Sequence, residues 1–365
     1  MSGLEGEAQD SGFLPTIVPI GGFLGAGKTS LIVAAARLLK GRGVRAAAVL
    51  NDQGAELVDT SFVEANGIQA GQVVGGCFCC RLSDLIYAAE ALRAQMPEVI
   101  FAEAVGSCTD ISATVMQPLK LDYAERFRVA PYTVVVDPDV ASRFMDPKTD
   151  PGLTFLFEKQ IEEADLVCFT KTDVYTEFPS LPGCSPRFLS SQTGDGVAAW
   201  LDDILGGEFF PGGKTLEIDY ERYARAEAAL AWLNCSFTVE LAAPASPASV
   251  AGSLLDRLEA ALTAKAFTIA HLKVMDTSPA GWAKASIVRN GGEAFVQGNL
   301  DAPPAMAHEL LLNARAAGLP GDLRQAVEAE LAAIPGAVSI RALQCFSPSP
   351  PKPEKRVGYV VAGAD

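Results

Sequence analysis

The chain has 365 residues, of which 49% are apolar, and its formal net charge is −15. This length is typical of two domains, and the composition supplies enough apolar residues for a full core. The negative charge argues against a nucleic-acid partner and against docking on anionic lipid. No uninterrupted apolar stretch is long enough to span a membrane, and residues 1–11 lack the basic and then apolar order of a secretion signal. We therefore expect a cytoplasmic protein.

Short apolar runs alternate with helical patterns through the first part of the chain, up to residue 205. Such alternation predicts an α/β fold with a mostly parallel sheet covered by helices on both faces. Polar residues and glycines follow the apolar runs, at the edge where parallel sheets bind ligands. The predicted strands cover residues 14–20, 44–50, 98–105, 132–136 and 166–169, and the predicted helices cover 29–39, 82–95, 154–164 and 197–205.

Glycine and proline at residues 206–213 mark a linker, and the pattern changes after it. We expect a smaller α+β domain in which Asn290-Gly291-Gly292 forms a hairpin turn, with ferredoxin-like packing as one arrangement that fits. Helices are predicted at 220–233, 248–264 and 323–333, and strands at 235–241, 269–275, 283–289, 293–297, 309–314 and 338–345. The predicted division is therefore 1–210, 211–346 and a proline-rich tail without regular structure, 347–365.

The strongest motif is a glycine-rich loop between a predicted strand and a predicted helix, and it reads Gly22-Phe23-Leu24-Gly25-Ala26-Gly27-Lys28-Thr29. Backbone N–H groups of such a loop surround phosphates, and the following helix adds its positive N-terminal end. Lys28 would reach the β- and γ-phosphates, and the Thr29 hydroxyl would bind Mg²⁺. A chance glycine-rich turn is the alternative, and the flanking strand and helix weigh against it. The predicted phosphate-binding residues are Gly22, Gly25, Ala26, Gly27, Lys28, Thr29 and Ser30.

The motif that would select the base is Thr170-Lys171-Thr172-Asp173, which stands after a strand where GTPases carry Asn-Lys-x-Asp. The Asp173 carboxylate can accept hydrogen bonds from N1–H and N2–H of guanine, and the Lys171 stem can lie over the ring. Thr170 in place of Asn removes an amide that braces the loop. Ser191 lies in a later loop that resembles the one whose backbone N–H meets guanine O6. An ordinary surface loop is the alternative, and the two signals together favour GTP over ATP.

Glu103-Ala104-Val105-Gly106 ends another predicted strand. The Glu103 carboxylate can hold Mg²⁺ or orient the attacking water, and the N–H of Gly106 can approach the γ-phosphate. We therefore expect Lys28, Glu103 and Gly106 to act in catalysis. A polar residue at a strand end is the structural alternative for Glu103. Spacing alone identifies no catalytic arginine.

Three of the eight cysteines, Cys77, Cys79 and Cys80, follow the paired glycines Gly75-Gly76. Thiolates at this spacing can face one centre, and soft thiolates select Zn²⁺, Cu⁺ or other thiophilic metals. Three ligands leave a tetrahedral centre one short, which suits metal transfer better than a permanent structural site. A redox pair of Cys77 with Cys80 is the main alternative, although a third thiol adds nothing to such a pair.

The other cysteines are scattered along the chain. Cys168 and Cys235 lie in apolar strands, where a core role is expected. Cys108 follows Glu103 closely, which would place it near the nucleotide, and we assign it no chemistry.

The order of these motifs resembles the CobW-like P-loop GTPases, which include metallochaperones, zinc-regulated metalloprotein activators and nitrile hydratase activators. The resemblance covers about the first 205 residues. It is carried by Gly22-Phe23-Leu24-Gly25-Ala26-Gly27-Lys28-Thr29, Asn51-Asp52-Gln53-Gly54, Gly76-Cys77-Phe78-Cys79-Cys80, Glu103-x-x-Gly106 and Thr170-Lys171-Thr172-Asp173. It implies that GTP hydrolysis is coupled to delivery of a metal to a client protein, with Cys77, Cys79 and Cys80 as metal ligands.

The chain departs from the family pattern at several positions. The family has Asn-Glu-Phe-Gly at Asn51–Gly54, Glu-Thr-Ser-Gly at Glu103–Gly106, and Asn at Thr170. Many members also carry a histidine-rich stretch, whereas this chain has only His271 and His308, which we expect to be ordinary polar residues on strands. These departures indicate a divergent member with its own client.

The expected ligands are GTP, Mg²⁺ and a transition metal, with Zn²⁺ first and Co²⁺ or Fe²⁺ as alternatives. The expected partner is a client metalloprotein or cofactor enzyme, and a homodimer is left open. Two other functions stay open: a GTP-dependent activator of a corrinoid or metalloenzyme that transfers no free metal, and a regulatory GTPase whose thiols sense metal or redox state.

Overall fold

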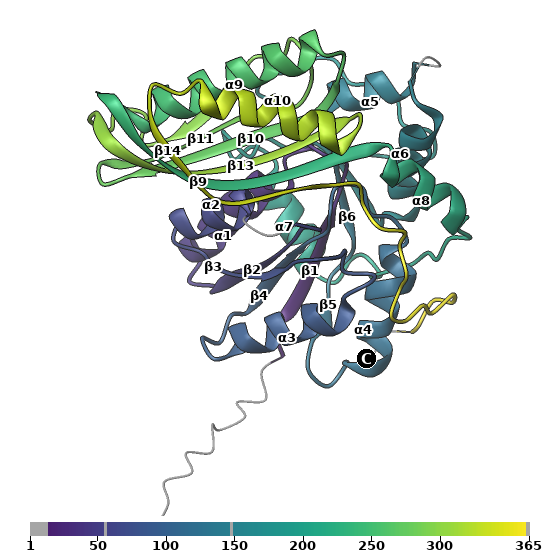
Figure 1. Ribbon diagram of the computed structural model, residues 1–365. Coiled ribbons are helices and arrows are strands. Elements are labelled where there is room, and N and C mark those ends of the chain that lie inside the picture. The colour runs from purple at the N-terminus through teal and green to yellow at the C-terminus, as the bar shows by residue number, and fades with distance from the viewer. Residues whose placement is uncertain (1–13, 55–56, 147–148, 363–365) are drawn as a thin grey trace, which may run out of the picture.

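The computed structural model describes residues 14–54, 57–146 and 149–362. These residues form two sheets with their helices (Figure 1). The strands of the first sheet are β1 (Thr16–Gly21), β2 (Ala46–Asn51), β3 (Gln69–Val73), β4 (Val99–Glu103), β5 (Arg128–Val129), β6 (Thr133–Val136), β7 (Leu166–Phe169) and β8 (Arg187–Phe188). The helices of this part are α1 (Lys28–Gly41), α2 (Val58–Ala65), α3 (Leu82–Arg93), the π-helix Ser112–Met116, α4 (Gln117–Asp122), α5 (Pro138–Phe144), α6 (Pro151–Glu163) and α7 (Val197–Leu205).

The first sheet has the order β3-β2-β4-β1-β6-β7-β8, with β5 beside β1, and every pairing in it is parallel. Its central strands are buried on both faces, because one apolar cluster packs against α3 and α6 and another against α1 and α7. This explains why the central strands read as continuous apolar runs. The predicted α/β fold with a mostly parallel sheet is confirmed. The ends of β1, β2, β4 and β7 meet at one edge, where the predicted motifs follow them.

The second part of the chain contains α8 (Tyr220–Ala228), β9 (Leu230–Ala245), α9 (Pro247–Ala264), β10 (Thr268–Ser278), β11 (Gly281–Ile287), β12 (Phe295–Gly298), β13 (Ala305–Ala317), α10 (Pro320–Ala332) and β14 (Gly336–Phe346). Its sheet is antiparallel, with the order β12-β11-β10-β13-β9-β14. Apart from the added strands β11 and β12, the element order is the β-α-β-β-α-β order of ferredoxin-like domains. The expected α+β domain is confirmed.

Side chains on the second sheet alternate between two different environments. Val274 and Leu312 join the apolar layer beneath α9 and α10. Lys273, Asn313 and Arg315 point to the opposite face, where each bonds to the first part of the chain. Figure 1 shows the same layering, with α9 and α10 above the sheet and the parallel sheet below it. The second sheet therefore covers the ligand-binding edge of the first with a polar face.

The helix predicted at 220–233 is wrong at its C-terminal end. It stops at Ala228, and β9 begins at Leu230. Alanine-rich sequence favours a helix at this place, but Leu230 and Trp232 are buried by pairing with β13 and β14. Tertiary pairing therefore overrides local propensity.

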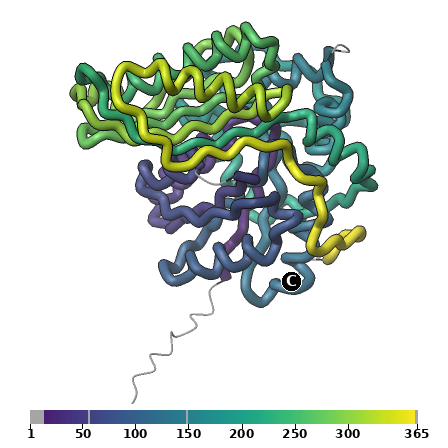
Figure 2. Tube along the Cα trace, viewed as in Figure 1, coloured from purple at the N-terminus to yellow at the C-terminus, as the bar shows by residue number. Residues whose placement is uncertain are grey.

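The proline-rich tail that follows β14 contains no helix or strand over residues 347–362. Figure 2 shows it leaving the second sheet and running along the first part of the chain. The backbone N–H of Glu354 donates to the carbonyl of Cys79 at 3.0 Å, and the Arg356 guanidinium pairs with Asp110 at 2.7 Å. The tail is thus fixed across the loop that carries the three cysteines.

Among the described residues, none of the helices has the length and apolar character needed to cross a bilayer. The residues used to judge a secretion signal, 1–11, lie outside the described part of the chain.

Candidate nucleotide and metal site

The glycine-rich loop connects β1 to α1 and has the backbone geometry of an anion-binding loop. Gly22 has a φ of 130°, and a Cβ added to it would lie 2.2 Å from the carbonyl oxygen of Val135. Gly27 is the N-cap of α1 with a φ of 92° and makes no side-chain cap. The N–H groups at the start of α1 are therefore free of a capping side chain and suited to phosphate.

Lys28 is buried in this loop, and its ammonium group donates to the carbonyl of Gly22 at 2.8 Å. Burial lowers the pKa of Lys28, while the nearby carboxylate of Glu103 acts in the opposite direction. A buried cation of this kind gains stability when phosphate charge arrives. Its position fits the phosphate contact predicted for Lys28.

Thr29 and Glu103 are brought together from α1 and the end of β4. The Thr29 hydroxyl donates to Oε1 of Glu103 at 3.1 Å, and Oε2 of Glu103 is buried without a hydrogen-bond partner among the described residues. Burial, together with the negative charge of Asp59, raises the pKa of Glu103 to about 7. A hydroxyl beside an unpartnered carboxylate oxygen is a donor set that suits Mg²⁺. The residues present therefore fit this cation.

Gly106 lies against the phosphate loop. A Cβ on Gly106 would be 2.7 Å from Cδ2 of Leu24 and 3.0 Å from its backbone nitrogen, so this position has no space for a side chain. Gln160 binds the carbonyls of Gly106 and Cys108 at 3.0 and 2.8 Å. The segment after β4 is thus held between the phosphate loop and α6.

The motif predicted to select the base also contacts the phosphate loop. The Thr170 hydroxyl donates to the carbonyl of Ala26 at 2.8 Å, so it braces the phosphate loop directly and compensates for the missing Asn. Asp173 accepts a hydrogen bond from the Ser190 hydroxyl at 2.6 Å. This contact joins the motif to the loop of Ser191. Lys171 extends to Asp137 at 2.5 Å and is only partly buried.

The three cysteines of the predicted metal site lie within 4.8 Å of one another by their sulfur atoms. The Sγ atom of Cys80 is 3.5 Å from that of Cys77 and 3.6 Å from that of Cys79. Cys77 and Cys79 are buried, whereas Cys80 is half-buried. Sulfur atoms around one tetrahedral zinc ion lie about 3.8 Å apart, because Zn–S bonds are about 2.3 Å long. The spacing therefore fits a thiophilic metal.

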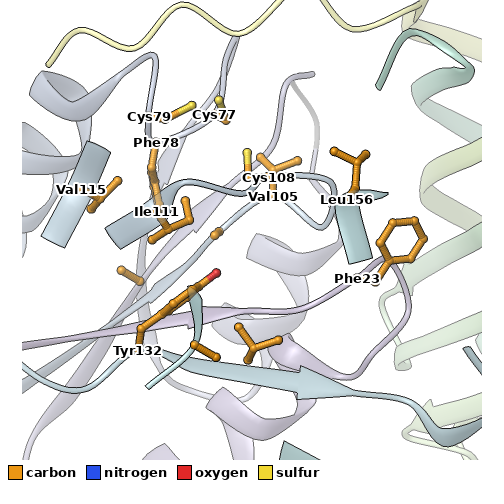
Figure 3. Packing of buried hydrophobic residues seen from close by; sticks show 14 of the residues in the cluster. Phe23, Cys77, Phe78, Cys79, Val105, Cys108, Ile111, Val115, Tyr132 and Leu156 are labelled. Carbon is orange, nitrogen blue, oxygen red and sulfur yellow. The ribbon is translucent and has the colours of Figure 1, made fainter. Parts of the chain in front are cut away.

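Cys108 is directed toward the same cluster (Figure 3). Burial opposes ionisation of its thiol, but hydrogen bonds from Cys77 and Cys79 outweigh burial and lower its pKa to about 7. The hydrogen bond to Cys108, in turn, raises the pKa of Cys79 well above its ordinary value. The sequence places Cys108 near the nucleotide but does not reveal that its main neighbours are Cys77 and Cys79. Its only signal in sequence is its place two residues after Gly106.

Asn51 connects the end of β2 to the thiol loop. Its side-chain amide donates to the carbonyl of Gly76 at 2.8 Å and accepts from the N–H of Phe78 at 2.7 Å. The next residue, Asp52, forms two short bonds with Arg315 of β13, at 2.8 and 2.7 Å. The segment after β2 thus contacts both the thiol loop and the second sheet.

A cavity of about 820 Å³ lies beside the thiols, between the first part of the chain, β14 and the tail. Cys77, Cys80 and Glu227 line it on one side, and Lys352 of the tail lines it on the other. The backbone N–H of Lys352 donates to Sγ of Cys80 at 3.0 Å. A small ligand in this cavity would therefore contact Cys77 and Cys80.

His271 and His308 lie on strands, as expected, but both are buried. His308 bonds to Asp276 at 2.8 Å. Burial lowers the pKa of His271 well below its ordinary value. Neither histidine belongs to the group of three thiols, and both lie on strands, His271 on β10 and His308 on β13.

Glu163, the last residue of α6, should make the stability of the protein depend on pH. Its carboxylate accepts from the Thr109 hydroxyl at 2.9 Å and from the N–H of Ser112 at 3.1 Å, and burial raises its pKa from 4.5 to about 8. Below pH 4.5 the group is protonated in both states. Between pH 4.5 and about 8, Glu163 is ionised in the unfolded chain but still protonated in the folded protein. The free energy of unfolding therefore falls by up to about 1.4 kcal/mol per pH unit as the pH rises through this range.

Glu163→Gln should remove this part of the pH dependence, as measured by urea unfolding between pH 5 and 8. The control is Glu162→Gln, because the Glu162 side chain is 54% exposed. An unchanged slope of unfolding free energy against pH in Glu163→Gln would contradict the raised pKa.

The parallel sheet and the glycine-rich loop define a P-loop nucleotide hydrolase. Residues 16–184 match the family model of the CobW/HypB/UreG nucleotide-binding domain. Residues 16–184 therefore carry a nucleotide-binding domain of this family, as the motifs predict, and the match supports a P-loop GTPase, an enzyme that hydrolyses GTP. None of the curated protein sequences matches the chain.

Several solved structures resemble the chain at low identity. HypB from Helicobacter pylori in complex with nickel is 16% identical, with a TM-score of 0.40, over 53% of this chain and 86% of that one. HypB from Archaeoglobus fulgidus is 19% identical, with a TM-score of 0.35, over 53% and 89%. Zn(II)-bound YjiA GTPase from E. coli is 14% identical, with a TM-score of 0.32, over 87% and 98%. Because these values are low, we base the assignment on the family match.

Proposed function

We propose that this GTPase couples GTP hydrolysis to the delivery of a thiophilic transition metal to a client metalloprotein or cofactor enzyme. The observation that supports the proposal most is the direct bonding between the two sites. Asn51 forms hydrogen bonds with the residues on both sides of Cys77 in the thiol loop. Gly106, which lies two residues before Cys108, packs against Leu24 of the phosphate loop. A structural change at the terminal phosphate could therefore reach the thiols through either of these two segments.

In this proposal Lys28, Thr29 and Glu103 hold the phosphates and Mg²⁺, with the loop residues Gly22, Gly25, Ala26, Gly27 and Ser30 around them. Bound Mg²⁺ would neutralise phosphate charge. Thr170, Lys171, Asp173 and Ser191 select guanine. Loss of the γ-phosphate alters the contacts of Gly54 and Gly106, and the thiol site then releases its metal.

The second sheet adds positive charge close to the phosphate loop. Lys273 and Lys284 pair with Asp59 of α2 at 2.6 and 3.4 Å, and Lys284 is almost fully buried. The backbone of β10 also lies near the loop, because a Cβ on Gly25 would be 3.8 Å from the carbonyl of Ala270. These lysines can stabilise phosphate charge.

The metal proposed for the thiols is Zn²⁺ first, with Co²⁺ or Fe²⁺ as alternatives. Thiolate ligands favour soft and borderline ions, and Zn²⁺ accepts tetrahedral sulfur coordination. The client would dock beside the cavity of about 820 Å³, where the thiols, β14 and the tail meet. This arrangement favours a carrier over an activator that transfers no free metal, because the thiol site borders a space that a client can enter.

The test is a transfer experiment with purified protein and Zn²⁺. Wild type should bind Zn²⁺ with GTP present and pass it to a competing chelator faster once GTP is hydrolysed than when a non-hydrolysable GTP analogue is bound. The variant in which Cys77, Cys79 and Cys80 are all serine should lose this binding, whereas Cys168→Ser, on buried β7, should retain it. Equal release in both nucleotide states would favour a regulatory GTPase instead.

A further inference from the structure

We propose that Cys108 is the fourth sulfur ligand of the metal site, so that Cys77, Cys79, Cys80 and Cys108 surround one ion. This inference rests on the proposed metal-carrying function and names the ligand that the three-cysteine loop lacks. The first three sulfurs have the spacing of a tetrahedral face, with separations of 3.5 and 3.6 Å at Cys80. Such a face leaves one vertex open.

The Cys108 thiol faces Cys77 and Cys79, and its interaction with them raises the pKa of Cys79 and lowers that of Cys108. Its side chain is 1% exposed, so this interaction is shielded from solvent. Figure 3 shows the sulfur of Cys108 directed toward Cys77 and Cys79 from a different segment of the chain. Cys108 lies outside the group of three sulfurs that are within 4.8 Å of one another, so it would have to lose its proton and move toward them to become a metal ligand.

Glu227 is the competing ligand, because it also borders the thiols. It accepts a hydrogen bond from the Ser107 hydroxyl, and its second oxygen, Oε2, is buried with no hydrogen-bond partner in the part of the chain that the structure describes. Thiophilic ions prefer sulfur over carboxylate oxygen. The sulfur of Cys108 is also directed toward two of the three thiols. The structure therefore favours Cys108, with Glu227 as a measurable alternative.

The position of Cys108 gives this ligand a different role from the other three. It lies on the segment that Gln160 holds through the carbonyls of Gly106 and Cys108, and Gly106 is packed against Leu24 of the phosphate loop. The other ligands lie on the loop that Asn51 holds. A relative movement of these two segments would withdraw one sulfur of four, which would lower metal affinity and leave three ligands in place.

The experiment counts sulfur ligands in the full-length protein. X-ray absorption of wild type with one equivalent of Zn²⁺ should fit four sulfurs, and Co²⁺ should give the intense absorption of a tetrahedral thiolate complex. Cys108→Ser should give three sulfurs and one oxygen or nitrogen. The Zn²⁺ affinity of this variant should fall by on the order of 10-fold to 100-fold or more, because replacing even a residue that only hydrogen-bonds to a metal ligand costs about that much.

Two controls separate the possible outcomes. Cys168→Ser tests the effect of replacing a buried cysteine away from the cluster, and Glu227→Gln tests the competing ligand. Three sulfurs in wild type, or loss of an oxygen ligand in Glu227→Gln, would overturn the inference while leaving the proposed function intact. Failure of wild type to bind Zn²⁺ at any cysteine would instead reject the proposed function. The wild-type sulfur count is decisive even where Cys108→Ser does not fold.

Discussion

Lys28→Ala is expected to remove the stabilisation that GTP gives to the protein and to lower kcat/KM for GTP by on the order of 10³-fold, because a buried, preorganised cation at the phosphates is lost. Nucleotide-free protein should unfold at the same temperature or a higher one. Burial already lowers the pKa of Lys28, so its charge is costly before phosphate arrives. Thermal unfolding with and without GTP, together with phosphate release, measures both effects.

The matched control is Lys40→Ala, because Lys40 lies in the last turn of the same helix and is exposed. It should leave GTP turnover and the GTP-dependent rise in Tm unchanged. If Lys28→Ala kept the full rise in Tm with GTP, the phosphate role of Lys28 would have to be abandoned.

Arg315→Ala is expected to cost about 3–5 kcal/mol of unfolding free energy, the usual cost of removing one partner from a buried ion pair. The Arg315 side chain is fully buried, and it bonds to Asp52 in two places and to the carbonyl of Leu233. Its guanidinium also lies over the ring of Trp232 at 4.2 Å. Removal leaves the Asp52 carboxylate without its cation and frees the segment after β2.

Arg341→Ala provides the comparison for this effect. Arg341 pairs with Glu309 at 2.9 Å, but the two side chains are 55% and 64% exposed, so a loss of about 0–1 kcal/mol is expected. Urea unfolding measures both variants. The Asp52→Asn and Arg315→Ala double variant should lose less than the sum of the single changes, and full additivity would show that the pair does not act as a unit.

The fold could be predicted from the sequence where local pattern and tertiary structure agree. Buried parallel strands read as apolar runs, and α7 and β7 match their predicted ranges. β3 gave no such signal, because four of its five residues are exposed or half-buried at the sheet edge. The sequence at the beginning of β9 predicts a helix instead, because the pairing that buries Trp232 involves strands about 80 and 110 residues away.

The candidate site divides in the same way. The phosphate loop and the thiol loop are continuous in sequence, so spacing alone reveals them. Cys108, Glu227 and Arg315 come from separate segments, and only folding brings them to Cys77 and Asp52. No spacing rule connects residues 77 and 108, since they follow β3 and β4, which come together only because both strands pair with β2. Long-range contacts of this kind are outside the reach of a single sequence.

The way the second sheet is seated has a consequence for cooperativity. Leu230, Trp232 and Ala270 belong to the same apolar cluster as Phe23 of the phosphate loop, so one core extends across both parts of the chain. The tail ties β14 back to the cysteine loop as well. Cutting the chain in the linker would therefore expose apolar surface on both fragments. Neither fragment should be an autonomous folding unit, and we expect the intact chain to melt in a single calorimetric transition.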